Sequence, residues 1–422
     1  MAATHRSPSA IPMPRPRAFD STREFLADPY RYIGGQCRAL NTDVFQSRLL
    51  LAPTIFLSGP RAAELFYDGE RFQRRGAAPE PLQATLFGKR AVQSLDGPDH
   101  WRRKALFLDT LDRPAVAALA GHVGRHWETA LARWPRDGVA LYGAAQDVLA
   151  RAVCEWAGVS LPEAEASART RQLVALFDDA ARGLLAHGRA RWSRLRLQAW
   201  LAGQVERARR QGGAAAGDSP LQQVAAFRDA AGGRLDARLA ATELLNVLRP
   251  VVAVSVYIVF GLHAAQAHPE VLRSRRDEPA GVGMDFLNEV RRYYPFFPAV
   301  AARVREDFEW NGYWFPKGRR AVLDLYGTNH DSRAWNDPDR FDPGRFRARV
   351  PTAFEFIPQG GADAARGHRC PGEDAALAIM KVSLDFLLAR TQCVTAGGDM
   401  ALDYARLPAL PRSELVVRAA VL

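Results

Sequence analysis

The chain is poor in cysteine and contains no long apolar run. Its four cysteines, Cys37, Cys154, Cys370 and Cys393, lie far apart in 422 residues and form no CxxC pair. This distribution argues against a disulfide framework and against a zinc site, and it favours a reducing compartment. The longest apolar run, Val251–Leu262, falls short of the roughly 20 residues that a membrane-spanning helix needs. We therefore expect no membrane span.

Lysine is also scarce. Only four of the 57 basic residues are lysine, and the arginines are spread along the whole chain. The formal net charge of +11 is of the kind that attracts nucleic acid or a membrane surface. Because the arginines do not form one cluster, we interpret the charge mainly as compositional bias and expect no nucleic-acid partner. A functional basic face is the alternative interpretation.

The N-terminus lacks acidic residues and the apolar core of a signal peptide. Residues 1–17 are instead rich in proline and in basic side chains. Such a composition indicates disorder rather than a targeting device. We therefore assign residues 1–18 to a disordered leader and residues 19–422 to the folded part of a cytoplasmic protein.

Helical periodicity dominates the middle of the chain, and its 48% hydrophobic content allows a large buried core. The expected helices are Thr22–Arg38, Ala62–Tyr67, Asp99–Leu108, Arg113–Trp134, Leu141–Trp156, Ala164–Gly183, Trp192–Gln211, Pro220–Ala230, Arg234–Ala265, Met284–Tyr294 and Ala375–Leu388. Strands are expected as a pair in Asp43–Leu57, as a hairpin in Phe308–Phe315 and in Arg320–Tyr326. Gly212–Asp218 is expected to be a connector, and Gly327–Gly367 a long irregular stretch. This order predicts one large, mainly α domain with small β-sheets.

Cys370 has a setting that the other cysteines lack. It follows the glycine-rich stretch Phe356–Gly367 and precedes the last apolar helix. Pro371 suits a first helical position, and Glu373 falls in the first turn. The positive end of that helix would favour thiolate over thiol, and a haem iron accepts such a thiolate as its proximal ligand. A buried structural cysteine is the alternative.

Two motifs precede this cysteine. Glu289 and Arg292 lie within pairing distance on one helical face, and Phe341-Asp-Pro-Gly-Arg345-Phe346 follows them. An E-x-x-R helix, an F-x-P-x-R-F loop and Cys-Pro-Gly, in this order, resemble the cytochrome P-450 superfamily. The resemblance implies the cytochrome P-450 fold, haem b (iron protoporphyrin IX) bound with Cys370 as the metal ligand, and a buried network of Glu289, Arg292 and Arg345 that holds the cysteine loop.

An arginine and a proline lie side by side in the most apolar helix. Pro250 removes a backbone hydrogen bond at a cost of about 3 kcal/mol, and an unpaired buried Arg249 would add several kcal/mol. Either Arg249 turns outward to a structural acid, or it faces a distal pocket and binds an anionic ligand. The acid–threonine pair of most superfamily members is absent from this helix. The Arg-Pro pair resembles the fatty-acid peroxygenase branch, of the fatty-acid alpha/beta-hydroxylase type.

That branch implies hydroxylation of fatty acids at the alpha and/or beta carbon with hydrogen peroxide, through an oxidant formed at the thiolate-ligated haem iron. The substrate carboxylate pairs with Arg249 and acts as the general acid–base, and a redox partner is not required. Pro250 and Gln93 complete the catalytic assignment, because hydroxylating members carry glutamine where decarboxylating members carry histidine. The alternatives are a fatty-acid decarboxylase that gives terminal alkenes, a reductase-dependent monooxygenase, and a non-catalytic haem protein.

The remaining site residues fall into two groups. Apolar side chains expected along the fatty-acid tail are Leu86, Phe87, Phe177, Phe296 and Phe297. The resemblance implies His100 as a haem-propionate ligand, with Tyr67, Arg71 and His368 at similar positions and Lys104 one turn after His100. His368 stands where most superfamily members have arginine, and this departure fits the peroxygenase branch.

Overall fold

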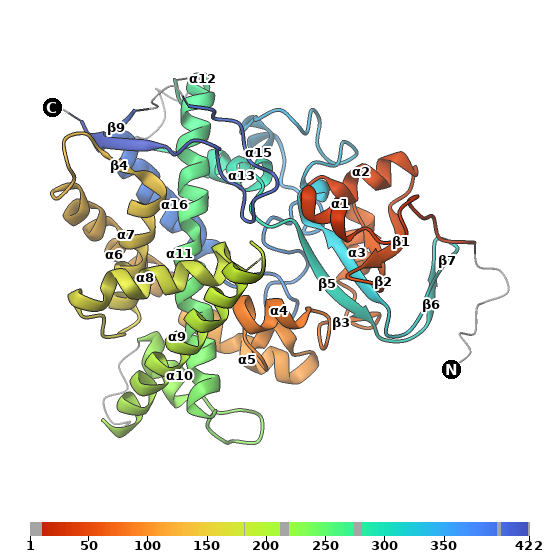
Figure 1. Cartoon of the computed structure of the whole chain (residues 1–422), viewed down its shortest axis with the longest axis horizontal. Coiled ribbons are helices and arrows are strands. Elements are labelled where there is room, and N and C mark those ends of the chain that lie inside the picture. The colour runs from red at the N-terminus through yellow and green to blue at the C-terminus, as the bar shows by residue number, and fades with distance from the viewer. Residues whose placement is uncertain (1–10, 181, 212–218, 274–280, 395–397, 421–422) are drawn as a thin grey trace.

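The computed structural model describes residues 11–180, 182–211, 219–273, 281–394 and 398–420. Figure 1 shows a body of helices around the long helix α11 (Ala237–Ala267), with a sheet-containing region beside it that is built mainly from the N-terminal part of the chain. The prediction of a mainly α fold with small sheets is confirmed.

The other helices are α1 (Thr22–Ala27), α2 (Tyr32–Ala39), α3 (Pro60–Phe66), α4 (Glu80–Leu82), the π-helix η1 (Gln83–Phe87), the 3-10 helix η2 (Val92–Ser94), α5 (Gly97–Thr110), α6 (Arg113–Leu131), α7 (Leu141–Trp156), α8 (Glu163–Asp178), α9 (Leu184–Arg210), α10 (Pro220–Ala226), α12 (Pro269–Arg273), α13 (Met284–Tyr293), α14 (Leu325–Asn329), α15 (Gly344–Ala348) and α16 (Glu373–Arg390). The strands are β1 (Val44–Leu49), β2 (Ala52–Leu57), β3 (Phe72–Gln73), β4 (Val139–Ala140), β5 (Ala299–Val304), β6 (Phe308–Trp310), β7 (Tyr313–Phe315), β8 (Arg320–Asp324), β9 (Thr391–Val394) and β10 (Val416–Ala419).

The largest sheet has the strand order β1-β2-β8-β5-β3. β1 and β2 form an antiparallel hairpin in which Val44 faces Leu57, and β2 pairs in parallel with β8. A smaller sheet has the order β4-β10-β9, and β6 and β7 pair around the predicted Asn311-Gly312 turn. The large sheet thus joins three strands from the N-terminal part of the chain with two strands from residues 299–324.

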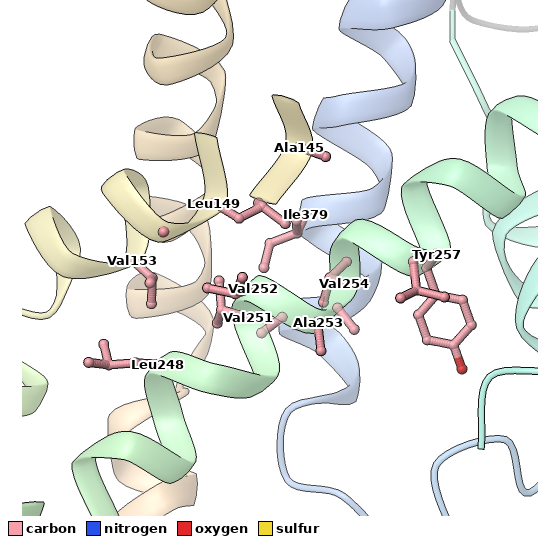
Figure 2. Packing of buried hydrophobic residues seen from close by; sticks show 14 of the residues in the cluster. Ala145, Leu149, Val153, Leu248, Val251, Val252, Ala253, Val254, Tyr257 and Ile379 are labelled. Atoms are coloured by element: carbon pink, nitrogen blue, oxygen red, sulfur yellow. The ribbon is translucent and has the colours of Figure 1, made fainter. Parts of the chain in front are cut away.

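The main core is centred on α11. This helix packs against α7, α8, α9 and α16, and Figure 2 shows Val252 of α11 among Leu149 of α7 and Ile379 of α16. Among the described residues α11 is the one helix whose length and composition would allow a membrane span, and 94% of the apolar window is buried inside the fold.

Several element boundaries differ from prediction. Thr22–Arg38 is two helices, because Pro29 disfavours helical geometry at the residue before it. The helix predicted from Trp192 starts at Leu184, and the one predicted up to Gly183 ends at Asp178. Strand β5 was not predicted at all. The predicted connector at 212–218 lies outside the described residues.

The N-terminal segment corrects a second prediction. Ile11 forms a bridge with Tyr313 and donates its amide to the carbonyl of Gly312 at 2.8 Å. Met13 is buried in the cluster that includes residues of the large sheet and of α3. Residues 11–18 therefore belong to the folded structure, although their composition indicated a disordered leader; the earlier residues of that leader lie outside the described part.

Candidate functional site

Cys370 lies at the end of the glycine-rich loop, just before α16. Its amide donates to the carbonyl of Gln359 at 3.0 Å, and the amide of Gly372 donates to its Sγ at 3.4 Å. The helix begins at Glu373, so Pro371 is not its first residue as predicted, whereas Glu373 does lie in the first turn. Burial raises the pKa of the Cys370 thiol, and the Gly372 amide opposes this. The sulfur is therefore contacted by the amide of Gly372, the residue that immediately precedes the first turn of α16.

The glycines of this loop allow close packing. A Cβ on Gly360, where φ is +96°, would lie 3.2 Å from the hydroxyl of Tyr67, and one on Gly361 would lie 2.6 Å from the carbonyl of Ala353. Tyr67, from the end of α3, thus lies against the loop. Other side chains at these positions would displace Tyr67 or the loop.

Lys104 of α5 also binds the cysteine loop. Its Nζ donates to the carbonyl of Arg369 at 2.7 Å and also to the carbonyl of Gly367. Only 2% of the residue is exposed, and burial lowers the pKa of Lys104 to about 8. The structure therefore places this predicted cofactor ligand on the backbone of the cysteine loop.

Arg291 provides a third support, which sequence reasoning missed. Its Nε donates to Oε1 of Gln359 at 3.0 Å, and its Nη2 lies 3.1 Å from Oε2 of Glu373. Arg369 also binds Glu373, at 2.7 Å. The sequence did offer one signal. Arg291 is the residue next to Arg292 in α13, so its side chain points about 100° away around the helix and can reach a different element.

The predicted network of Glu289, Arg292 and Arg345 is brought together in the core. Arg292 binds Glu289 through two bonds of 2.7 and 2.8 Å, and Arg345 Nε donates to Glu289 Oε1 at 3.2 Å. Arg292 also donates to the carbonyls of Asn329 and Pro338, both at 2.9 Å. This network holds the irregular stretch that leads to the cysteine loop.

Two of the predicted propionate ligands lie in contact. The rings of His100 and His368 stack with centroids 4.0 Å apart, and His368 Nε2 lies 3.8 Å from Asp96. Burial lowers the pKa of His100 to about 3 and that of His368 to about 4. Both rings are therefore neutral near pH 7, with ring nitrogens able to donate a hydrogen bond.

The arginine next to this histidine pair is not the predicted one. Arg71 pairs with Asp68 at 3.1 Å, and its guanidinium lies over the ring of Phe308. Arg74 instead donates to the carbonyl of Ala301 at 2.7 Å and lies 5.5 Å from the ring centre of Tyr67. Burial lowers the pKa of Arg74. A sequence alone cannot separate these two arginines, because both follow the same helix.

Arg249 lies inside α11, followed directly by Pro250. The residue is 8% exposed, its Nε is buried without a partner, and it has no ion pair with any described residue. Burial lowers the pKa of Arg249 to about 9; nearby Arg194 acts in the same direction, and Cys370 opposes both. Because an unpaired buried cation is costly, this geometry indicates an anion site.

The one acid near Arg249 on the same helix is already engaged. Glu243 accepts from Arg103 at 2.5 Å, from the amide of Val92 at 3.1 Å and from Asn246 at 3.2 Å. Asn246 also donates to Oε1 of Gln93 at 3.4 Å. Gln93 thus lies beside α11 one turn before Arg249, on a hydrogen-bonded chain that leads to Glu243.

A buried arginine of α9 shapes the neighbouring segment η1. Arg194 donates to the carbonyl of Thr85 at 2.7 Å and to that of Phe87 at 3.0 Å. Gly88 follows with φ of +95°, and a Cβ there would lie 2.2 Å from Arg194 Nη2. These contacts fix Leu86 and Phe87 of η1.

The predicted tail residues occupy two places. Leu86, Phe87 and Phe177 belong to η1 and α8, which are in contact, and join the main core. Phe296 and Phe297 lie after α13, where the ring of Phe296 packs 4.3 Å from that of Tyr257. The structure places all five partly or wholly inside; their contact with a substrate stays a prediction.

The residues present fit a haem. Cys370 is partly buried, and the described residues include no cluster of three or more histidine, cysteine or acidic side chains that could hold a metal ion without a porphyrin. The hydroxyl of Tyr257 and Nε of Arg249, both on α11, are buried without partners. Both side chains lie close enough to Cys370 for its charge to raise their pKa. A cysteine sulfur before a helix, with two neutral histidines that can donate hydrogen bonds nearby, forms the surroundings that an iron porphyrin with carboxylate arms requires. Fold and site together define a haem-thiolate oxidoreductase.

Comparison with known proteins agrees. The family model described as cytochrome P-450 matches residues 284–404. A solved structure of cytochrome P450SP alpha (CYP152B1) in complex with (R)-ibuprofen is 45% identical, with a TM-score of 0.91, and the match covers 94% of this chain and 98% of that one. Cytochrome P450EX alpha (CYP152N1) with myristic acid is 37% identical, with a TM-score of 0.92 and coverage of 96% and 98%. The chain belongs to the cytochrome P-450 family, as the sequence motifs predicted.

A third structure, ligand-free cytochrome P450 OleT, is 30% identical, with a TM-score of 0.91 and coverage of 96% of this chain and 99% of that one. Curated relatives align over shorter segments. Cytochrome P-450 84A4 of Arabidopsis thaliana is 34% identical over 108 residues, which is 24% of this chain and 20% of that protein. The chain thus aligns with about a fifth to a third of the length of the first curated relatives.

Proposed function

We propose that this protein hydroxylates fatty acids at the alpha and/or beta carbon with hydrogen peroxide as the oxidant. The observation that carries the proposal is the buried guanidinium of Arg249, which has no ion-pair partner in the described structure. Two of the similar structures contain carboxylic acids, (R)-ibuprofen and myristic acid. A carboxylate on Arg249 would form a charge-assisted and bidentate pair, which satisfies the buried charge.

The cofactor we propose is haem b. Cys370 would ligate its iron, and His100, His368 and Arg74 would hold its carboxylate arms. Bound in this way, the haem supplies an iron centre that uses peroxide to oxidise a C–H bond. In the overall reaction a C–H bond becomes C–OH, the O–O bond of the peroxide breaks, and the second oxygen leaves as water.

No acidic side chain in the described part of the chain pairs with Arg249. Glu243 is engaged with Arg103 and Asn246, and residues 251–260, which follow Pro250 in α11, are apolar except for Ser255 and the Tyr257 hydroxyl. We therefore assign proton transfer to the substrate carboxylate, which accepts a proton from peroxide and returns it to the leaving hydroxide. Arg249 keeps that carboxylate ionised and fixes its position.

Head-group binding also sets where oxidation occurs. A carboxylate held on Arg249 places its first two methylene carbons nearest to the reacting oxygen, and the apolar side chains of η1 and α8 line the path of the tail. Gln93 supports hydroxylation over decarboxylation to terminal alkenes, because it offers an amide rather than an imidazole beside α11. Because peroxide carries both electrons, we propose that no redox partner is needed. The cysteine distribution supports a cytoplasmic location.

The test uses purified haem-loaded protein with myristic acid and hydrogen peroxide, without NAD(P)H, and mass spectrometry of the products. We expect 2- and 3-hydroxymyristic acid, and at least a hundredfold loss of product with Arg249→Gln. Arg207→Gln, an exposed arginine of α9, is the matched control and should retain full activity. Full turnover by the Arg249 variant, or turnover that requires NAD(P)H and a ferredoxin, would refute the proposal. Terminal alkenes as the main product would favour the decarboxylase alternative.

A further inference from the structure

The outer face of α9 exposes four large apolar side chains. Their exposed fractions are 92% for Leu184, 89% for Leu185, 53% for Trp192 and 67% for Leu195. Gly188 lies between them, Ala199 follows Leu195 by one turn, and both are exposed. At about 100° per residue, all six fall within an arc of roughly 100° around the helix. They form one apolar stripe, the α9 stripe, on the side away from the core.

The fold does not need this stripe. The opposite side of α9 packs on α11 and α8 through buried residues that include Ala190, Leu197 and Leu201. An apolar face that is exposed while the inner face is already satisfied indicates an interaction surface rather than part of the core. It lies outside the candidate haem site.

Arginines border the α9 stripe. Residues 180–205 contain five arginines and no acidic residue. Arg191 lies on one border, where Glu80 of α4 binds it at 3.2 Å, and Arg189 lies on the other, where Asp179 binds it at 2.9 Å. Arg196 lies on the same border as Arg189 and has no ion pair with any described residue. Because Glu80 is shared by Arg191 and Lys89, and because Arg196 has no acid, each border keeps one cation in excess of the acids that pair there. The stripe itself carries no charge.

We propose that the α9 stripe docks on an anionic lipid surface. A helix that presents an apolar arc with arginines on its borders is suited to lie in the plane of a membrane interface, with its leucines below the headgroups. Anionic headgroups supply the charge that the arginines attract. Trp192, whose ring carries the guanidinium of Arg196 at 4.7 Å, has the amphipathic character of interfacial tryptophans. A second copy of the chain is a poorer partner, because two such faces would bring arginines together.

Docking there would bring lipid next to the substrate path. The inner side of α9 holds η1 through Arg194, and η1 carries Leu86 and Phe87. A fatty acid dissolved in the bilayer would therefore have only the thickness of one helix to pass. This link to substrate supply rests on the proposed function, whereas lipid docking itself does not.

The experiment is sedimentation of the full-length haem-loaded protein with vesicles of phosphatidylglycerol and phosphatidylcholine, or of phosphatidylcholine alone. We expect binding to the anionic vesicles that weakens with added salt. The triple variant Leu184→Ser, Leu185→Ser, Leu195→Ser should bind at least tenfold more weakly. The control is Leu50→Ser with Leu51→Ser, two leucines of the β1–β2 turn that are 56% and 70% exposed, and its binding should be unchanged.

Three results would overturn the docking proposal. They are no vesicle binding by the parent protein, equal binding by the triple variant, and a concentration-dependent dimer in sedimentation velocity that the triple variant loses. The altered side chains are exposed, so thermal unfolding should confirm an unchanged fold. Without vesicles, the triple variant should oxidise the short, water-soluble decanoic acid at the parent rate. Loss of peroxide activity with vesicle binding intact would count against the proposed function alone.

Discussion

Arg291 and Glu373 form a buried ion pair, 3.1 Å between Nη2 and Oε2, that joins α13 to the first turn after Cys370. We expect Arg291→Leu to destabilise the protein by roughly 1.5–3 kcal/mol, because Glu373 would lose one charge-assisted partner and keep the other, Arg369. The ferrous–CO spectrum should also show a smaller fraction of thiolate-ligated haem, since the loop loses its contact at Gln359. Denaturant unfolding and that spectrum are the measurements.

A matched control exists on α16. Lys381 pairs with Asp385 at 2.8 Å on the same helix but is 45% exposed, so Lys381→Gln should cost less than about 1 kcal/mol. Similar losses in the two variants, or an unchanged spectrum for Arg291→Leu, would show that α13 does not position the cysteine loop.

The two arginines after α3 give a second prediction. Arg74 lies beside Tyr67 and the histidine pair, whereas Arg71 is bound to Asp68 and is 41% exposed. We expect Arg74→Gln to lose haem to apomyoglobin several times faster than the parent, and Arg71→Gln to behave like the parent. Faster loss in the Arg71 variant alone would restore the assignment that the sequence suggested.

Gly88 and Gly183 form a matched pair for a third prediction. Their φ angles are +95° and +94°, but a Cβ meets Arg194 and Thr242 at Gly88 and nothing within 4 Å at Gly183. Both alanine variants carry the backbone cost of about 1–3 kcal/mol. Gly88→Ala should lose about 1–3 kcal/mol more from overpacking, measured by denaturant unfolding. Equal losses would mean that η1 and Arg194 adjust freely.

Asp324 makes the folding free energy depend on pH. It is buried, accepts from the amide of Gly327 at 2.7 Å, and burial raises its pKa to about 7. Between about pH 4 and pH 7 the unfolded chain has released this proton while the folded chain still holds it, so the free energy of unfolding falls as the pH rises. Above about pH 7 both states are ionised, and this contribution stays constant. The free energy of unfolding of Asp324→Asn, relative to that of the parent, should rise by on the order of a few kcal/mol from about pH 4 to about pH 7. Denaturant unfolding at several pH values measures this difference. A difference that does not change with pH would contradict the prediction.

Local sequence patterns predicted much of the fold. α7 has the predicted bounds, because its apolar positions repeat regularly and its ends lie at turns. The predicted start of α9 was eight residues too late, because Leu184 and Leu185 face outward and break the pattern of a helix with its apolar residues inside. β5 was missed because its alanines carry little strand preference and its pairing with β8 joins distant segments.

The candidate site was predicted where motifs fix residues close together in sequence. Cys370, Glu289, Arg292 and Arg345 belong to such motifs. Arg291 and Arg74 act through contacts with segments far away in the chain, and no local pattern separates them from the many solvent-exposed arginines. An arginine-rich composition therefore hides the buried arginines that matter most.

The bridge between Ile11 and Tyr313 bears on how the protein should be produced. Trimming the gene at residue 19, as the composition invites, would remove the Met13 side chain from beneath the large sheet and free the edge of the β6–β7 hairpin. An open strand edge beside an apolar hole promotes aggregation. Purification tags and cleavage sites are therefore better kept upstream of Ile11, where they leave the Ile11–Tyr313 bridge and the buried Met13 side chain intact.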